Sequence, residues 1–148
     1  MQNVDAFLQQ AILQAKLGLG SGGIPIGSVL VIANRIVAAG HNQRMQQGSP
    51  ILHAEMDCLE KAGRRTARDY QQSTLYSTLS PCDMCSGAIL LYKIPRVVIG
   101  ENRTFQGPEA YLRSRGVQVE VADDPECFEL MQTFISQNSR LWHEDIGE

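Results

Sequence analysis

Short apolar runs that alternate with helical patterns are the feature that most restricts how this chain can fold. Residues 28–33 and 36–40 form two β-rich runs joined by a turn at Asn34-Arg35, which predicts a hairpin. The remaining pattern predicts helices over 54–61, 82–92 and 108–115 and strands over 74–78, 96–100 and 117–121. Such alternation favours a layered α/β sheet with helices on both faces.

Apolar residues at helical spacing predict one further helix at each end. The first would bury Val4, Phe7, Leu8, Ala11, Ile12 and Ala15, and the glycines from Gly18 to Gly23 would end it. Those glycines fit G-x-G-x-x-G, but a dinucleotide fingerprint follows a strand and opens a helix, so we interpret them as a helix stop. Asp124-Pro125 opens the last helix, with an apolar stripe of Cys127, Leu130, Met131, Phe134 and Ile135.

Length and composition are those of an ordinary globular protein. The 148 residues contain no repeat or linker, which predicts a single domain over 1–148. No apolar run could span a bilayer and no secretory signal is visible, so we expect a cytoplasmic protein with reduced cysteines and no membrane partner. A net charge of −3 disfavours a nucleic-acid partner.

Two segments carry the chemistry, His53-Ala54-Glu55 and Pro81-Cys82-Asp83-Met84-Cys85. A Cys-x-x-Cys at the start of a helix places both sulfurs on nearly the same side. Ser80 can cap this helix and Pro81 suits its first turn, while the helix dipole favours the metal-binding thiolates. Two thiolates and one imidazole leave a tetrahedral zinc one open position, as a catalytic site requires.

Glu55 supplies the general base that a catalytic metal site needs. Two thiolates balance the charge of zinc, so a water at the open position needs a nearby carboxylate base. Glu55 would take its proton, pass it to a ring nitrogen of the substrate and then help to protonate the departing amine.

A redox pair or a structural zinc site would leave Glu55 and Pro81 unexplained. A structural site also needs a fourth ligand, and the remaining candidates lack paired spacing: Cys58, Cys127, His41 and His143. For Cys58 and Cys127 we favour a role as small buried residues. The combination H-x-E…P-C-x-x-C is the signature of zinc deaminases that act on nucleobases.

With these motifs the chain resembles the cytidine deaminase-like superfamily, and within it the fungal-type cytosine deaminases. The resemblance runs from Gly22 to the C-terminus and includes Gly40-His41-Asn42, residues 78–85 and the closing Glu144-Asp145-Ile146-Gly147-Glu148. It implies a three-layer α/β/α sandwich with a five-stranded mixed sheet, usually as a homodimer.

The resemblance also implies roles for individual residues. Its zinc ligands fall on His53, Cys82 and Cys85, with one Zn²⁺ per chain, and its proton shuttle falls on Glu55. Asn42 would pair with the N1–C2=O edge of a free base, and the backbone amide of Ala54 would hold the same carbonyl. The other substrate contacts would be Ser80 beside the reacting amine, Phe105 and Trp142 covering the ring, Ile26 beneath it and Asp145 near the leaving amine.

Each substrate contact has a simpler alternative, and some residues depart from the family pattern. Asn42 could be a turn residue, Phe105 and Trp142 could be ordinary core, and the acidic tail could be solvated. Fungal relatives tend to have Gly at the position of Ala54, an aromatic at Met45 and Phe at His143, and the loop after Phe105 is shorter here.

The implied reaction is the hydrolytic deamination of cytosine to uracil and ammonia, a step of pyrimidine salvage with a small-molecule nucleobase as partner. The alternative is a deaminase of another free base, such as guanine or isocytosine. A tRNA adenosine deaminase or a non-catalytic zinc-stabilised module fits less well, because the first needs an anion-binding surface and the second has no use for Glu55.

Overall fold

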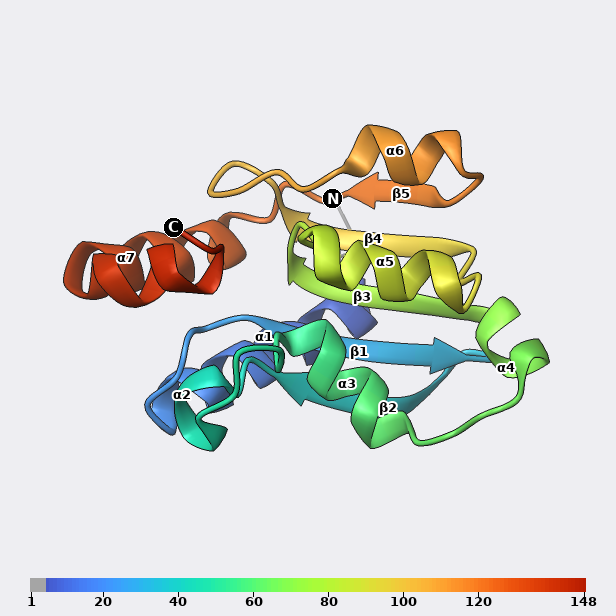
Figure 1. Cartoon of the computed structure of the whole chain (residues 1–148), viewed down its shortest axis with the longest axis horizontal. Coiled ribbons are helices and arrows are strands. Elements are labelled where there is room, and N and C mark those ends of the chain that lie inside the picture. The colour runs from blue at the N-terminus through green and yellow to red at the C-terminus, as the bar shows by residue number, and fades with distance from the viewer. Residues whose placement is uncertain (1–4) are drawn as a thin grey trace.

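The computed structural model describes residues 5–148, which form a five-stranded mixed sheet with helices on both faces (Figure 1). The strands are β1 (Gly27–Ile32), β2 (Arg35–His41), β3 (Ser73–Leu79), β4 (Arg96–Glu101) and β5 (Gln118–Val121). Their order is β2-β1-β3-β4-β5, with β1 antiparallel to both neighbours and β3, β4 and β5 mutually parallel. The predicted mixed sheet is confirmed.

Helices cover the sheet from both sides, which confirms the three-layer arrangement. They are α1 (Ala6–Gly20), α2 (Arg44–Gln47), α3 (Ala54–Ala62), α4 (Ala67–Gln71), α5 (Asp83–Leu91), α6 (Glu109–Ser114) and α7 (Pro125–Asp145). In Figure 1, α3 and α5 lie in front of the sheet and α1 lies behind it. Among residues 5–148, none of the helices is long and apolar enough to span a membrane.

Alternating side chains of the central strands build a separate core under each helical layer. Leu75, Val97 and Ile99 pack in the cluster that contains Cys58 of α3 and Ile89 of α5. Their neighbours along the same strands point the other way, because successive strand residues face opposite sides of a sheet. Tyr76 and Val98 therefore pack in the cluster under α1, beside Leu8 and Ile12.

The hairpin is confirmed, but its turn lies one residue earlier than predicted. Ala33 and Asn34 are the turn residues, with φ of 51° and 62°, whereas Arg35 already pairs with Ile32. Two consecutive positive φ angles are typical of a type I′ turn, whose twist matches that of the flanking strands. Ala33 lacks the usual turn signature, so the prediction at Asn34-Arg35 was wrong by one position.

Most helices agree with prediction, with shifts at their ends. α1 continues through Gly18 and ends at Gly20, so only the later glycines stop it, and Val4 lies outside the described residues. α6 begins at Glu109 with Pro108 at its N-cap, and Gly116 follows its end with φ of 91°.

The last helix changes direction part-way, and this bend brings its C-terminal end toward the N-termini of α3 and α5. Asp124 caps its N-terminus by accepting bonds from Glu126 and Cys127, as predicted. Asn138 has φ of −141° and ψ of 46°, so the α7 axis breaks there. Beyond the break, Trp142 and Asp145 are buried. Both lie at the end of the sheet where α3 and α5 begin.

Candidate active site

Two helices begin at this end of the sheet, and their first residues supply the donor atoms. His53 is the N-cap of α3, Cys82 is the N-cap of α5, and Cys85 lies in the first turn of α5. The prediction that Ser80 caps α5 and Pro81 occupies its first turn is wrong, because both precede the cap. Free N–H groups at two helix N-termini favour negative charge here, as thiolates require.

The three donor atoms are spaced as one tetrahedral zinc would hold them. His53 Nδ1 lies 3.4 Å from Cys82 Sγ and 3.8 Å from Cys85 Sγ, and all three donors lie within 4.8 Å of one another. Zinc bonds of ~2.3 Å to sulfur and ~2.0–2.1 Å to nitrogen, at tetrahedral angles, separate such donors by ~3.5–3.8 Å. The donor set therefore fits zinc with one position left for a non-protein ligand.

Hydrogen bonds and burial shift the pKa values of the three donor groups. A hydrogen bond from Cys85 and another with His53 lower the pKa of Cys82 to about 4. The same bond with Cys82, together with burial, raises the pKa of Cys85 well above its usual range. Burial lowers the pKa of His53, but the bond to Cys82 and the charges of Asp145 and Glu55 outweigh it and raise that pKa to about 9. Metal binding displaces the protons of these donor groups.

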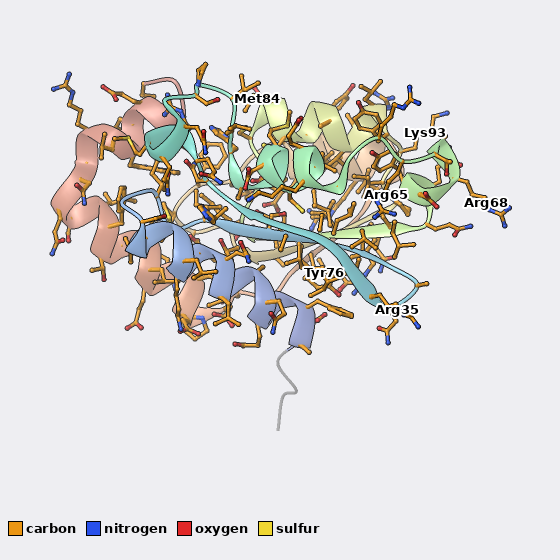
Figure 2. All side chains as sticks on the ribbon, turned by 90° about the horizontal axis from the view of Figure 1, so that it is seen from below. Arg35, Arg65, Arg68, Tyr76, Met84 and Lys93 are labelled. Atoms are coloured by element: carbon orange, nitrogen blue, oxygen red, sulfur yellow. The ribbon has the colours of Figure 1, made fainter. Side chains whose placement is uncertain are left out.

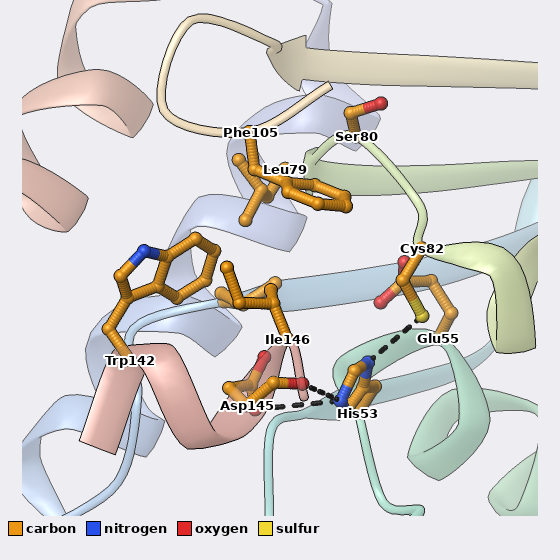
Figure 3. Close-up of a pocket in the computed structure, with 10 residues that line it drawn as sticks. His53, Glu55, Leu79, Ser80, Cys82, Phe105, Trp142, Asp145 and Ile146 are labelled. Carbon is orange, nitrogen blue, oxygen red and sulfur yellow. Dashed lines mark hydrogen bonds and ion pairs between the residues drawn. The ribbon is translucent and has the colours of Figure 1, made fainter. Parts of the chain in front are cut away.

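Glu55 lies in the first turn of α3 and is 4 % exposed. Burial raises the pKa of its carboxyl to about 7, against the opposing charge of His53. Figure 3 shows this carboxylate beside Cys82, at the edge of the donor cluster. A carboxyl group that is half ionised near neutral pH can both accept and return a proton, which suits a proton shuttle.

The second nitrogen of His53 is held by the C-terminal helix. His53 Nε2 lies 3.1 Å from the backbone carbonyl of Asp145 and 3.5 Å from its Oδ1 (Figure 3). When Nδ1 faces a metal, Nε2 carries the proton and donates a hydrogen bond to this carbonyl. Such a partner fixes the tautomer and the ring orientation of a metal-binding histidine.

Asn42 is fully buried and joins the same network from β2. Its Nδ2 donates to Asp145 Oδ1 over 2.8 Å, and its Oδ1 accepts from the backbone N–H of Arg44 over 3.0 Å. The guanidinium of Arg44 lies 3.7 Å from the same Asp145 oxygen. An amide offers two hydrogens and two lone pairs, so Asn42 retains one of each for a ligand.

A small pocket opens beside the donor cluster. Its lining consists of Ile26, His53, Glu55, Leu79, Ser80, Cys82, Phe105, Trp142, Asp145 and Ile146. Phe105 and Trp142 meet edge to face with ring centroids 6.2 Å apart, and they form an aromatic wall. A wider groove outside leads to this pocket and is also lined by His53, Cys82, Phe105, Asp145 and Ile146.

The structure brings most of the expected site residues to this pocket. Asn42, Ala54 and Cys85 are exceptions, because all three are buried rather than part of its lining. Leu79, Ile146 and, at the outer groove, Arg44 were not among the expected contacts. Cys58 and Cys127 are buried free thiols outside the donor cluster, as expected.

Comparison with known proteins agrees with this geometry. Residues 1–101 match the cytidine and deoxycytidylate deaminase zinc-binding region. The chain is 50% identical over 142 residues to a cytosine deaminase of Candida albicans, covering 95% of each protein. It is 37% identical over 143 residues to a tRNA-specific adenosine deaminase of Streptococcus pyogenes, covering 88% of this chain and 89% of the relative.

A solved guanine deaminase from Nitrosomonas europaea superposes with a TM-score of 0.73 at 18% identity, over 92% of this chain and 86% of that one. At that identity the likeness shows the fold. The sequence match covers both segments that supply the donor atoms. This chain therefore belongs to the cytidine and deoxycytidylate deaminase zinc-binding family.

Proposed function

We propose that this chain deaminates free cytosine hydrolytically, giving uracil and ammonia. The observation that carries the proposal is a buried carboxylate, Glu55, facing a His-Cys-Cys donor set inside a pocket closed by aromatic rings. The Candida albicans relative, a cytosine deaminase, supports this choice of substrate because half of its residues are shared over nearly the whole chain.

His53, Cys82 and Cys85 would hold one zinc ion. Zinc with one open position lowers the pKa of a water molecule and so supplies a nucleophile at neutral pH. Glu55 would accept the proton that this water loses as its oxygen bonds to ring carbon C4, and would return that proton to the neighbouring nitrogen N3. A second proton transfer through Glu55 reaches the exocyclic nitrogen. The carbon–nitrogen bond then breaks and ammonia leaves.

The polar groups around the pocket are suited to the edges of a pyrimidine. The remaining hydrogen and lone pair of Asn42 match the N1–H and C2=O edge of cytosine. Ala54 is the first residue of α3, so its backbone N–H has no partner within the helix and can bind the same carbonyl. Asp145 is acceptor-only when ionised and suits the amine or the departing ammonia. Because Asn42 and Ala54 lie behind the lining, substrate contact requires a small inward adjustment around Asp145.

The charges around the pocket mouth support a free base over a nucleic acid. The outer groove carries Arg44, but also Asp83, Glu144 and Asp145. A nucleic acid is a polyanion and binds to surfaces rich in basic side chains. Basic side chains instead gather at the end of the molecule away from α7, where Figure 2 labels Arg35, Arg65, Arg68 and Lys93. This arrangement disfavours a tRNA substrate, for which the Streptococcus pyogenes relative is specific.

A homodimer and a cytoplasmic location remain part of the proposal. Exposed apolar side chains support the dimer. Leu91 and Tyr92, at the end of α5, and Ile51, before α3, are 70%, 43% and 53% exposed on the helical layer that contains α3 and α5. Covering such residues is a common reason for association. Light scattering would give twice the chain mass, and a monomer at all concentrations would remove this part of the proposal.

An ultraviolet assay with the purified, zinc-loaded protein tests the function directly. Cytosine, cytidine, guanine and adenosine are offered at equal concentration, and only cytosine is expected to turn over readily. The protein should contain about one zinc per chain, and chelation should abolish turnover until zinc is restored. Turnover of guanine or adenosine in preference to cytosine would overturn the proposal, as would full activity without metal.

A further inference from the structure

The loop between β4 and α6 separates the enclosed pocket from the groove outside it. Phe105, in the middle of this loop (residues 102–108), lines both. Its ring packs against Trp142 from α7. Within residues 5–148 no hydrogen bond joins the backbone of Phe105 or Gln106 to another residue, so the position of the ring depends on bonds on either side of it.

Ser80 supplies one of these bonds, although it lines the pocket. Figure 3 shows its hydroxyl turned away from the pocket. Ser80 Oγ accepts a hydrogen bond from the backbone N–H of Gly107 over 3.0 Å and donates one to Glu109 Oε2 over 2.7 Å. One bond joins the loop and the other joins Glu109 at the start of α6, so the hydroxyl proton is not free for a substrate.

Glu109 joins the two ends of the loop. Its Oε2 accepts the Ser80 bond that leads to Gly107, and its Oε1 accepts a bond from Asn102 Nδ2 over 3.2 Å. The guanidinium of Arg113 lies 3.9 Å from Oε1. Glu109 is 2 % exposed, and a buried carboxylate needs such partners to offset its lost hydration. The Glu109 carboxylate therefore holds both Ser80 and Asn102 in place.

The loop is also packed closely against the segment that carries the metal donors. A Cβ atom at Gly107 would overlap the carbonyl oxygen of Pro81, the residue before Cys82, so only glycine permits this approach. On the other side of Phe105, Glu101 accepts the backbone N–H groups of Arg103 and Thr104 over 2.8 and 2.9 Å. The loop is thus anchored on both sides of the aromatic ring.

We propose that Glu109 is a positioning residue which, through Ser80, Gly107 and Asn102, holds the Phe105 loop closed over the pocket. Glu109 lies outside both the pocket lining and the donor cluster. The inference rests on the proposed function for its consequence in catalysis. With the loop held, Phe105 contacts a small flat base. With the loop released, the base loses this contact and larger ligands can enter.

Glu109→Gln tests this role with almost no change in volume. The new amide nitrogen cannot accept a bond, so either Ser80 or Asn102 loses its partner. The single tryptophan of the chain, Trp142, reports the outcome without any substrate, because it packs against Phe105. We expect acrylamide to quench its fluorescence at least about twofold more strongly in the variant, with zinc content unchanged. Glu129→Gln, an exposed position on α7, serves as the control.

Steady-state kinetics separate positioning from a general loss of structure. We expect KM for cytosine to rise about fivefold or more, the equivalent of one lost hydrogen bond of about 1 kcal/mol. kcat should be unchanged or higher, because a looser loop does not slow product release. A purely structural role would instead lower kcat in proportion to the unfolded fraction. Glu109→Asp, which keeps the charge, should recover part of the KM change.

Unchanged quenching and unchanged KM in a folded Glu109→Gln variant would refute the proposal. If that variant does not fold, Ser80→Ala decides the question, because it breaks the bond to Gly107 and should give the same rise in quenching and KM. If the wild-type protein does not turn over cytosine, the proposed function fails. The quenching comparison still tests the loop.

Discussion

The side-chain amide of Asn42 donates a hydrogen bond to the carboxylate of Asp145 across 2.8 Å, although 103 residues separate them in the chain. The backbone carbonyl of Asp145 binds the second nitrogen of His53. One residue near the C-terminus thus orients two elements of the site with two different atoms. The carboxylate holds Asn42, and the main chain holds a metal donor. These two functions can be separated by mutation.

Asp145→Ala should impair turnover while zinc stays bound. The substitution removes the carboxylate that binds Asn42, and that we propose binds the leaving amine, but retains the backbone carbonyl that binds His53. Lost pairing of a buried polar group costs about 1–3 kcal/mol, so kcat/KM for cytosine should fall at least about tenfold. Steady-state rates test the loss of turnover, and metal analysis of the same preparation tests whether zinc is retained. Loss of zinc in step with activity would show that the carboxylate, not the carbonyl, secures His53.

Asn42→Ala should lower kcat/KM by at least about tenfold with zinc content unchanged. Because Asn42 also accepts from the backbone of Arg44, the variant should lose about 1–3 kcal/mol of stability as well. The kinetic comparison is therefore made at a temperature where both proteins are fully folded. An unaltered kcat/KM would reduce Asn42 to a structural residue of the turn after β2.

The metal donors and the sheet could be predicted from sequence because both depend on short-range patterns. Cys82 and Cys85 share one helical turn, and Glu55 follows His53 at a fixed interval, so local geometry places each pair. Apolar runs indicated the β-strands. The run at 28–33, for example, corresponds to β1. Such signals need no knowledge of distant contacts.

Features that depend on distant contacts could not be predicted in this way. α2 and α4 span four and five residues, too few for a helical period to be visible, and both were missed. Ser80 had the residue type of a helix cap, but Glu109 and Gly107 occupy its hydroxyl instead. The contact of Asp145 with His53 depends on the break at Asn138, which no local pattern marks.

Glu55→Gln should retain zinc and lose about 10²–10⁴-fold in kcat, the usual range for general acid–base catalysis. The amide preserves shape but cannot take the proton from water. Glu60→Gln provides a matched control, since Glu60 lies exposed on the same helix and should tolerate the change. Near-normal kcat in the Glu55 variant, measured on zinc-replete protein, would rule out the shuttle role.

Cys58 should make the folded protein less stable at high pH. Burial raises the pKa of its thiol from 9.0 to about 12, so between these values the unfolded chain loses a proton that the folded protein keeps. Its contribution is complete below pH 9 and is lost as pH rises toward 12, at up to about 1.4 kcal/mol per pH unit.

Urea unfolding of zinc-loaded wild type and Cys58→Ala at several pH values from 8 to 11 measures this effect. The cavity left by alanine adds a constant difference, whereas the difference in unfolding free energy should shrink above pH 9. Other titrations are common to both proteins and cancel. Parallel curves across the whole range would mean that Cys58 ionises equally in both states.

The end of α7 should decide whether the site accepts a free base or a nucleoside. Trp142, Asp145 and Ile146 form one side of the pocket, with Asp145 against His53 and Trp142 beside Phe105. A base enclosed by these residues and Phe105 would have no space for a ribose on N1 of the ring. We expect kcat/KM for cytidine to be far below that for cytosine. Equal turnover of the two would contradict this geometry.

Deleting residues 141–148 tests the same wall by removal and also probes the metal. Without Trp142 and Asp145 the pocket opens to water, so cytosine turnover should collapse. The truncated protein also lacks the carbonyl that holds His53 Nε2, and losing such a partner lowers zinc affinity about 10–100-fold. Competition with a coloured chelator measures this loss, and circular dichroism checks that the sheet survives. Asp145→Ala, which keeps the carbonyl, should hold zinc as tightly as wild type. A truncated protein that deaminates cytosine at full rate would show that the wall is dispensable. One that binds zinc as tightly as wild type would show that His53 needs no support from α7.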